Sequence, residues 1–273
     1  MKTQNLLIAI FISVIISSCA TEHIYYQVYK VAPTEKTTLS LNKNYFVYED
    51  ENCIVSYNFW DEGGNIGFIF NNKSNQDIYL NMEESYFIIN QIAHNYYKNR
   101  TVANSIGVSL SKGGVVSESI LRLLNNDKDL INKLTEINEN GLEISTKRLE
   151  SYVEEKIICI PSMTAKIIAE YKVKSSFYID PDLNPYPSKK QIITKNYTKS
   201  NSPFVFSNRL LYTVGKTGNP IKFENEFYIS EITNYPENEI VKKSHYYTSR
   251  VLIKTFTNSS PDKFYIRYNY INQ

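Results

Sequence analysis

Residues 53–60 read CIVSYNFW, and this stretch decides the fold class. Apolar side chains fall at every second position, at Cys53, Val55, Tyr57 and Phe59. Successive residues of a β-strand point to opposite faces, so a period of two puts these four side chains on one face. The stretch therefore predicts a strand with one face in a protein core.

Similar short apolar runs, separated by polar turns, continue on both sides of this stretch. Gly63-Gly64 predicts a hairpin turn directly after it. The chain holds 23 Tyr and 13 Phe, whose shapes suit a pleated, half-buried surface. Such a pattern is typical of sandwiches and barrels. Further strands are predicted over residues 24–31, 66–71, 78–80, 86–89, 92–97, 156–160, 165–173, 204–206, 209–214, 226–232, 249–256 and 263–270.

One part of this pattern resembles a known family. Residues 67–72 read GFIFNN, residues 77–80 read DIYL and residues 85–87 read SYF. This phrase is similar to immunoglobulin-like accessory domains of envelope lipoproteins, in which a strand ending in Asn pairs with a strand of apolar and acidic residues. The motif covers about a tenth of the chain, and any antiparallel meander can produce it. The resemblance implies an immunoglobulin-like antiparallel β-sandwich.

The pattern changes over residues 103–151. Ser117 can cap a helix over 117–137, where apolar residues recur at helical spacing. We expect a mainly β fold elaborated by this helical and polar insertion. The helix either covers the core locally or offers a surface to a partner. The polar stretch 180–200 could join two modules, but the strand rhythm is alike on both sides of it, so we expect a single domain over 19–273.

The N-terminal segment has the pattern of a targeting signal. Lys2 precedes an uncharged apolar run over 6–16, and small residues lead from it to Cys19. The run is shorter than the ~20 residues that cross a bilayer. The segment resembles the signal peptide and lipobox of bacterial lipoproteins. That resemblance implies that residues 1–18 are removed and that Cys19 carries a diacylglyceryl group, which holds the protein on a membrane. The alternative is an ordinary signal peptide cut near Ala20.

The net charge of the chain and the residues after Cys19 limit the cellular location and the classes of partner that we expect. The chain has 30 Lys and Arg against 28 Asp and Glu, a net charge of +2. Nucleic-acid binding needs a positive face, so this balance argues against it. Ala20 and Thr21 follow Cys19 without an Asp, which in the resembling family favours the outer membrane. We expect an envelope protein that contacts the membrane through its lipid.

Two further cysteines and the single tryptophan are candidate site residues. An even pair, Cys53 and Cys159, remains once Cys19 is assigned to lipid, and an oxidising compartment permits a disulfide between them. Two buried free thiols that act as small apolar residues are the other alternative. Trp60 is a candidate for stacking on a sugar ring.

Catalytic and metal-binding patterns are sparse. His23, His94 and His245 show no metal-ligand spacing, and no nucleophile elbow, phosphate loop or dinucleotide motif is present. Asp180-Pro181-Asp182-Leu183-Asn184 starts like a calcium loop, but Pro185 stands where the sharp-turn glycine belongs. We therefore interpret it as a polar turn. The sequence predicts no catalytic residue, no metal site and no cofactor.

Three functions remain open. The first is a non-catalytic envelope lipoprotein that acts through protein contacts. The second is a glycan or ligand binder that uses exposed Tyr and Trp60, and a row of such side chains facing solvent would favour it. The third is a hydrolase of unrecognised type, which needs a concave pocket with converging acids or with His94 and His245 together. The absence of catalytic motifs and the low charge favour the first.

Overall fold

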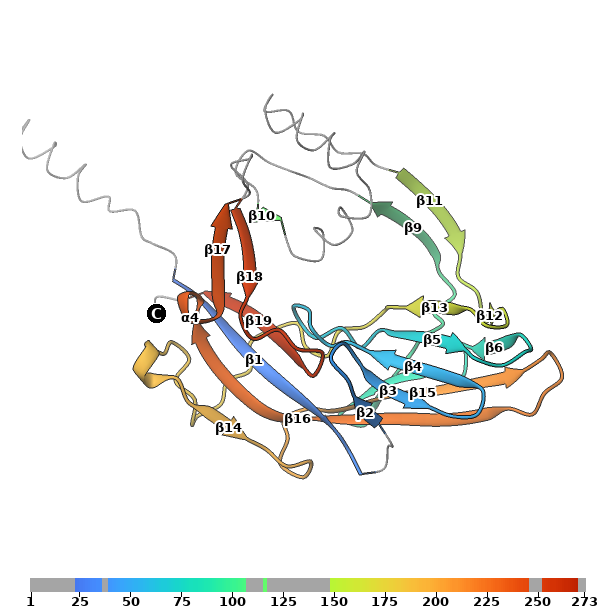
Figure 1. The fold of residues 1–273 in the computed structure, drawn as a ribbon, viewed down its shortest axis with the longest axis horizontal. Helices are drawn as coiled ribbons and strands as arrows, with labels where there is room; N and C mark the ends of the chain where they lie inside the picture. Colours follow the sequence, from blue (N-terminus) through green and yellow to red (C-terminus); the bar gives the residue numbers. More distant parts are fainter. Residues whose placement is uncertain (1–22, 36–38, 107–114, 117–147, 246–251, 270–273) are drawn as a thin grey trace, which may run out of the picture.

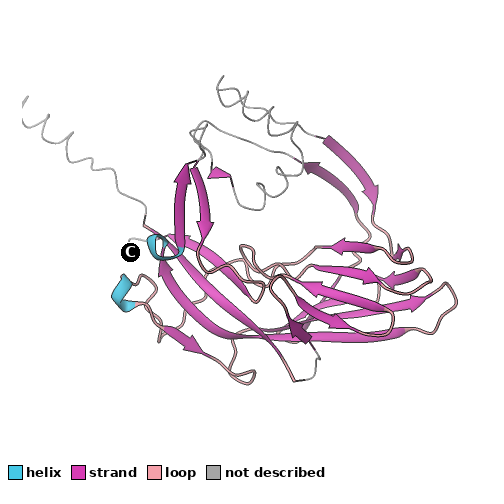
Figure 2. Cartoon of the chain, in the orientation of Figure 1, coloured by secondary structure: helices cyan, strands magenta, loops and turns pink. Residues whose placement is uncertain are grey.

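The computed structural model describes residues 23–35, 39–106, 115–116, 148–245 and 252–269 of the 273-residue chain. Strands dominate this part of the chain, and the two short helices lie at one margin of the molecule (Figure 2). The predicted mainly β class is therefore confirmed. Most strands belong to two antiparallel sheets, one of nine strands and one of five, here called the large sheet and the small sheet.

The small sheet begins with four strands that pair in chain order. Each strand pairs antiparallel with the next, and a strand from much later in the chain adds to the end of the sheet. The resulting order is β13-β5-β4-β3-β2. The strands are β2 (Leu39–Leu41), β3 (Phe46–Glu49), β4 (Cys53–Tyr57), β5 (Phe68–Asn72) and β13 (Ala165–Ile168).

The large sheet is built around one long strand, β16 (Ile221–Pro236). The first half of β16 pairs with β15, and its second half pairs with β14 on one side; β1 pairs along the other side. The main order is β12-β6-β15-β16-β1-β19. Figure 1 shows this sheet curling along its length. Its other strands are β1 (Ile24–Pro33), β6 (Ile78–Asn81), β7 (Tyr86–Ile89), β8 (Ile92–Asn95), β12 (Ile157–Ile160), β14 (Thr194–Asn196), β15 (Val205–Val214) and β19 (Lys263–Asn269).

The two sheets pack face to face over an aromatic core. The rings of Tyr57 and Phe227 meet edge to face at 5.3 Å, and those of Phe59 and Phe206 at 5.7 Å. Each of these pairs joins the chain of the small sheet to a strand of the large one. Edge-to-face pairs add about 0.5–1.5 kcal/mol each to the free energy of area burial. The predicted apolar face of residues 53–60 is confirmed, since Cys53, Val55, Tyr57 and Phe59 are all fully buried.

Two ribbons rise from the same side of the stacked sheets (Figure 1). The first pairs β9 (Thr101–Ile106) with β11 (Arg148–Val153), and the second pairs β17 (Val241–His245) with β18 (Leu252–Phe256). A short strand, β10 (Val115–Val116), pairs parallel with β18. The helices are η1 (Lys189–Gln191) and α4 (Glu237–Ile240).

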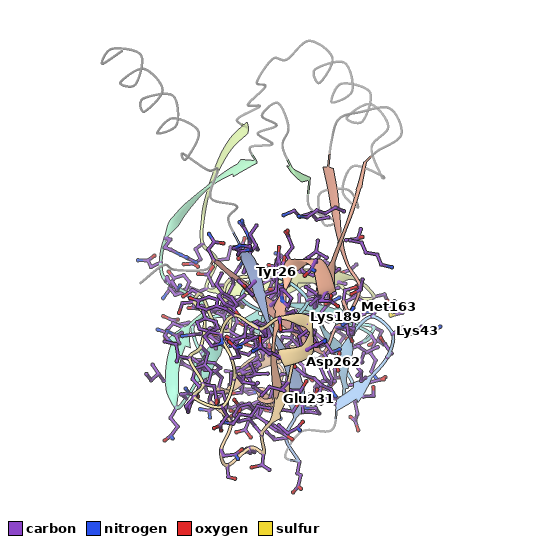
Figure 3. The ribbon with its side chains drawn as sticks, turned by 90° about the vertical axis from the view of Figure 1, so that its left-hand side faces the viewer. Tyr26, Lys43, Met163, Lys189, Glu231 and Asp262 are labelled. Carbon is purple, nitrogen blue, oxygen red and sulfur yellow. The ribbon has the colours of Figure 1, made fainter. Side chains whose placement is uncertain are left out.

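A second, small core lies at the base of the β17–β18 ribbon. Tyr26 and Val28 of β1 are buried there against Ile240 and Val241. These side chains use the face of β1 opposite to that of Tyr29, which packs in the main core. Figure 3 labels Tyr26 just below the ribbons. Strand β1 is therefore covered on both faces.

The Gly63-Gly64 turn is confirmed. Both glycines have positive φ, +89° and +75°, in the connection between the antiparallel strands β4 and β5. A Cβ on Gly64 would lie 2.8 Å from the ring of Phe264. Glycine is required here both by the backbone conformation and by the close approach of a core ring.

Three expectations need correction or lie beyond the described residues. The predicted strands over 204–206 and 209–214 are one continuous strand, β15. The predicted insertion over 103–151 is bounded by paired strands, because its two ends belong to β9 and β11. The predicted helix over 117–137 lies outside the described residues. Seven strands of the described residues were not predicted, namely β2, β3, β9, β10, β11, β14 and β17.

Candidate interaction surface

The two sheets end together along one side of the molecule. Strand β12 is the last strand of the large sheet, and β13 is the last strand of the small sheet. The chain passes from one to the other through residues 161–164. Within the described ranges, β12 pairs with β6 alone and β13 with β5 alone. Each strand therefore has one open hydrogen-bonding edge.

Alternation shows which backbone groups lie on the open edges. Asn72 N donates to Thr164 O at 2.9 Å, and Met82 N donates to Lys156 O at 2.8 Å. Backbone groups of an antiparallel strand face its two neighbours in turn. The N–H and C=O groups of the odd-numbered residues of both strands, Ile157, Cys159, Ala165 and Ile167, therefore face outward. Such a row is a template for pairing with another chain.

Exposed apolar side chains accompany these open edges. Ile157 is 54% exposed, Met163 73% and Ile167 74%, and Cys159 is exposed as well. We call these four side chains the edge patch. Figure 3 shows Met163 at the periphery of the molecule. Native edge strands are commonly protected by charges, prolines or bulges, yet the pairing of β13 shows no bulge and Lys166 is its one charged residue.

A buried asparagine fixes the edge. The side chain of Asn72 is fully buried, and its amide nitrogen donates to Gln76 O at 2.8 Å and to Ile160 O at 3.0 Å. Its oxygen accepts from the backbone N of Ser74 at 2.9 Å. Asn72 thus joins the end of β5 in the small sheet to the end of β12 in the large one. These hydrogen bonds hold the open edge in place.

A charged cluster lies beside the edge at the base of the β9–β11 ribbon. Arg100 pairs with Glu154 at 2.7 Å and with Glu170 at 2.8 Å, and Lys98 also reaches Glu170 at 2.8 Å. Burial by itself would raise the pKa of Glu154 and Glu170, but hydrogen bonds from the cations outweigh it and lower both pKa values below 4.5. Since Glu170 follows β13 closely, the cluster ties the ribbon to the edge.

Trp60 does not form an exposed stacking platform. Its indole is half-buried and packs against Phe256 at 5.2 Å and Tyr265 at 5.3 Å. Both partners belong to the rim of the small second core. Trp60 therefore helps to attach the β17–β18 ribbon to the sheets, which is a structural role that the sequence did not indicate.

Cys53 and Cys159 are both free in this structure, so the alternative of a disulfide between them is not formed. Cys53 is buried in the small sheet, and burial raises the pKa of its thiol. Cys159 belongs to the large sheet and is exposed. The pair therefore consists of one buried thiol and one accessible one, and Cys19 lies outside the described residues.

The histidines do not come together in the described part of the chain. His94 is exposed on β8 and lies 5.9 Å from the ring of Phe87. His23 is exposed before β1, and His245 ends β17. Among the described residues, no group of three or more His, Cys, Asp or Glu could hold a metal ion.

The segment that resembles a calcium loop is a turn whose carboxylates already hold a cation. Lys195 Nζ lies 2.7 Å from Asp180 and 2.6 Å from Asp182. Tyr197 also donates to Asp180 at 2.6 Å. Burial by itself would raise the pKa of Asp180, but these hydrogen bonds outweigh burial and leave the pKa below its ordinary value. The turn fixes strand β14 against the preceding loop.

Comparisons with known proteins add no family and no fold relative. No family model, no curated protein and no solved structure matches this chain. Within the described ranges, no helix has the length and hydropathy needed to cross a membrane.

Proposed function

We propose that this protein is a non-catalytic, lipid-anchored component of the bacterial cell envelope that acts through contacts with another envelope protein. The edge patch is the contact surface. The proposal includes an immunoglobulin-like β-sandwich as the fold, a diacylglyceryl group on Cys19 as the anchor, and the outer membrane as the location.

The edge patch carries the proposal. Three large apolar side chains, Ile157, Met163 and Ile167, are more than half exposed on the two edge strands and the connection between them. They accompany two rows of unpaired backbone groups. An exposed apolar edge is a liability in a protein that works alone. Addition of a strand or a loop from a partner would satisfy the backbone groups and cover the side chains.

The position of the first strand supports the anchor. Strand β1 begins at Ile24, within a few residues of Cys19. Because an extended residue spans at most ~3.6 Å, a lipid on Cys19 would hold the sheets within roughly 20 Å of the membrane surface. A partner in or near the same membrane would then be within reach of the edge patch.

Packing supports a single sandwich domain. One continuous hydrophobic core contains residues of both sheets, from Tyr29 to Ile266. The stretch over 180–200, which could have been a linker, contributes the buried side chain of Leu183 and the paired strand β14. This part of the chain belongs to the same folded unit as the strands on either side.

The test is a cross-linking and pull-down experiment from intact envelopes with the full-length protein. We expect a stoichiometric protein partner with the wild type. Ile167→Lys should lose that partner, because it puts a charge into the edge patch. The matched control is Ile179→Lys, which changes an equally exposed isoleucine, 79% exposed, away from the patch.

Cys19→Ala separates the anchor from the contact. This variant should leave the membrane fraction and lose the partner in intact envelopes. Equal partner recovery with Ile167→Lys and with the wild type would exclude the edge patch as the contact surface. Membrane retention of the Cys19→Ala protein would exclude the lipid anchor.

A further inference from the structure

A concave pocket lies on the outer face of the large sheet, away from the main core. In β15, Phe206 and Leu210 point into the core, so the alternate residues Ser207 and Arg209 point outward. These two residues and Glu224 of β16 form the floor of the pocket. The volume is about 990 Å³, at the upper end of the range for small-molecule sites.

The floor presents a fixed array of hydrogen-bonding groups. Arg209 binds Glu224 through Nε at 2.9 Å and through an Nη at 2.8 Å, and Ser207 donates to Glu224 at 2.7 Å. Arg209 and Glu224 are directly opposite each other on paired strands. The guanidinium and the carboxylate thus lie side by side on a rigid sheet, and each side chain is still about one third exposed.

The charges of the pocket are balanced. Lys199, on the loop beside the floor, pairs with Glu226 of β16. Together with Arg209 and Glu224, the pocket therefore carries two cations and two anions. A strongly charged ligand would gain from one member of each pair and be repelled by the other, so this arrangement favours a neutral ligand.

The walls are fixed before any ligand binds. Asn90 and Gln91 have positive φ and form the tight turn of the β7–β8 hairpin. Asn90 N donates to Val205 O at 2.8 Å, and its side-chain oxygen accepts from Val205 N at 3.0 Å. Apolar surface on these walls comes from Ile88, Ala93 and Pro203. A preorganised site avoids the ordering cost that binding otherwise carries.

We propose that this pocket binds a neutral polyhydroxylated ligand, namely a segment of a glycan. A vicinal diol can donate to the carboxylate of Glu224 and accept from the guanidinium of Arg209 at the same time. The apolar C–H face of a sugar ring would pack on Ile88, Ala93 or Pro203. The pocket is on a different strand set from the edge patch, so this site is independent of the proposed protein contact.

The test is isothermal titration calorimetry of the full-length, detergent-solubilised protein. The protein is titrated in turn with maltotriose, cellotriose, chitotriose and mannotriose. Inorganic phosphate is the anionic ligand for comparison. We expect at least one trisaccharide to bind at concentrations of about 10 mM or below, and phosphate not to bind. Binding of none of the four sugars, or tighter binding of phosphate, would overturn the proposal.

Two matched tryptophan substitutions test whether the sugar binds in this pocket. Ala93→Trp fills the pocket from an exposed position on β8 and should weaken sugar binding by about tenfold or more. Ala165→Trp puts the same side chain on an exposed position of β13, outside the pocket, and should leave sugar binding unchanged. Equal affinities of the two variants would show that the sugar binds elsewhere. Because Ala165→Trp lies on the open edge of β13 and Ala93→Trp lies in the pocket, a failure of the protein contact is distinguishable from a failure of the pocket.

Discussion

The edges at the two ends of the main strand order of the large sheet, β19 and β12, differ from each other. At β19, the chain segment after β4 closes the edge: Gly63 N donates to Tyr265 O at 2.8 Å, and Tyr265 N donates to Asp61 O at 3.3 Å. At β12, the backbone groups of Ile157 and Cys159 face outward with no partner in the described part of the chain. The main strand order of the large sheet therefore ends in one edge that is closed by the chain's own backbone and in one edge that is open.

Closing the β19 edge depends on glycine. The covering segment runs between β19 and the chain after β13, where Val173 N donates to Gly64 O at 2.9 Å. A side chain at Gly63 or Gly64 would meet Lys174 O or the Phe264 ring at less than 3.0 Å. The open edge has no such tight layer above it, so substitutions at the two edges should have very different effects.

The largest expected effect comes from breaking the closed edge with Gly64→Ala. The new methyl group would overlap the Phe264 ring at a positive φ, and the free energy of unfolding should fall by roughly 2–4 kcal/mol. Gly215→Ala is the control, since its φ is also positive but the nearest atom, Gln76 Oε1, lies 3.1 Å away. It should cost about 1 kcal/mol. Urea denaturation measures both, and equal losses would show that ring contact does not matter.

The second effect concerns the rigidity of the open edge. Asn72→Ala leaves the backbone groups of Ser74, Gln76 and Ile160 without their buried partner, so the free energy of unfolding should fall by about 3 kcal/mol. Hydrogen exchange along β12 should also become faster. Asn71→Ala changes the neighbouring, half-exposed residue and should cost ~0.5 kcal/mol or less. Unchanged exchange in β12 would contradict the role of Asn72.

The third effect is a pH dependence from the cluster beside the open edge. The pKa values of Glu154 and Glu170 are lower in the folded state than the ordinary 4.5. Their contribution to stability is therefore present above pH 4.5 and is lost as the pH falls through the lower folded values. Arg100→Gln should remove about 1 kcal/mol at neutral pH and flatten the stability profile below pH 4.5.

Urea denaturation of Arg100→Gln as a function of pH measures this effect. Arg267→Gln, which changes an exposed arginine of β19, is the control and should keep the wild-type profile. A wild-type pH profile in the Arg100→Gln protein would contradict the role of the cluster.

The smallest effect on stability is expected for Ile167→Lys in the edge patch. Its side chain is 74% exposed, so the free energy of unfolding should change by no more than about 0.5 kcal/mol. The charge should nevertheless reduce self-association of the purified protein, as measured by light scattering at increasing concentration. A large loss of stability would show that Ile167 packs in the fold rather than on an interaction surface.

Most strands could be predicted from the sequence because their apolar faces are buried in one core. Strands β4 to β8 follow the predicted ranges closely, and β1 begins at its predicted residue. Strand β14 was missed because Thr194-Lys195-Asn196 has no apolar side chain and is a strand only through its pairing with β16. Strand β3 was missed because only Phe46 of its four residues is buried. The helix over 117–137 stays a prediction.

The candidate surfaces were harder to predict than the strands. Residues 157–160 read IICI, which predicts a strand but does not indicate that Ile157 is exposed. Exposure follows from the position of β12 at the end of its sheet, and that position depends on pairing between distant segments. The pocket floor likewise joins Arg209 and Glu224 across two strands. The packing of Trp60 on Phe256 and Tyr265 could not be predicted either, because these partners lie far away in the sequence.

The place of β1 has a consequence for the order in which the chain can fold. Residues 24–33 pair with β16 on one side and with β19 on the other, and both partners lie beyond residue 220. Strand β1 is therefore synthesised long before the two strands with which it pairs. Contacts between such distant segments form slowly, because a long loop must close first. This topology delays completion of the large sheet until nearly the whole polypeptide has been made.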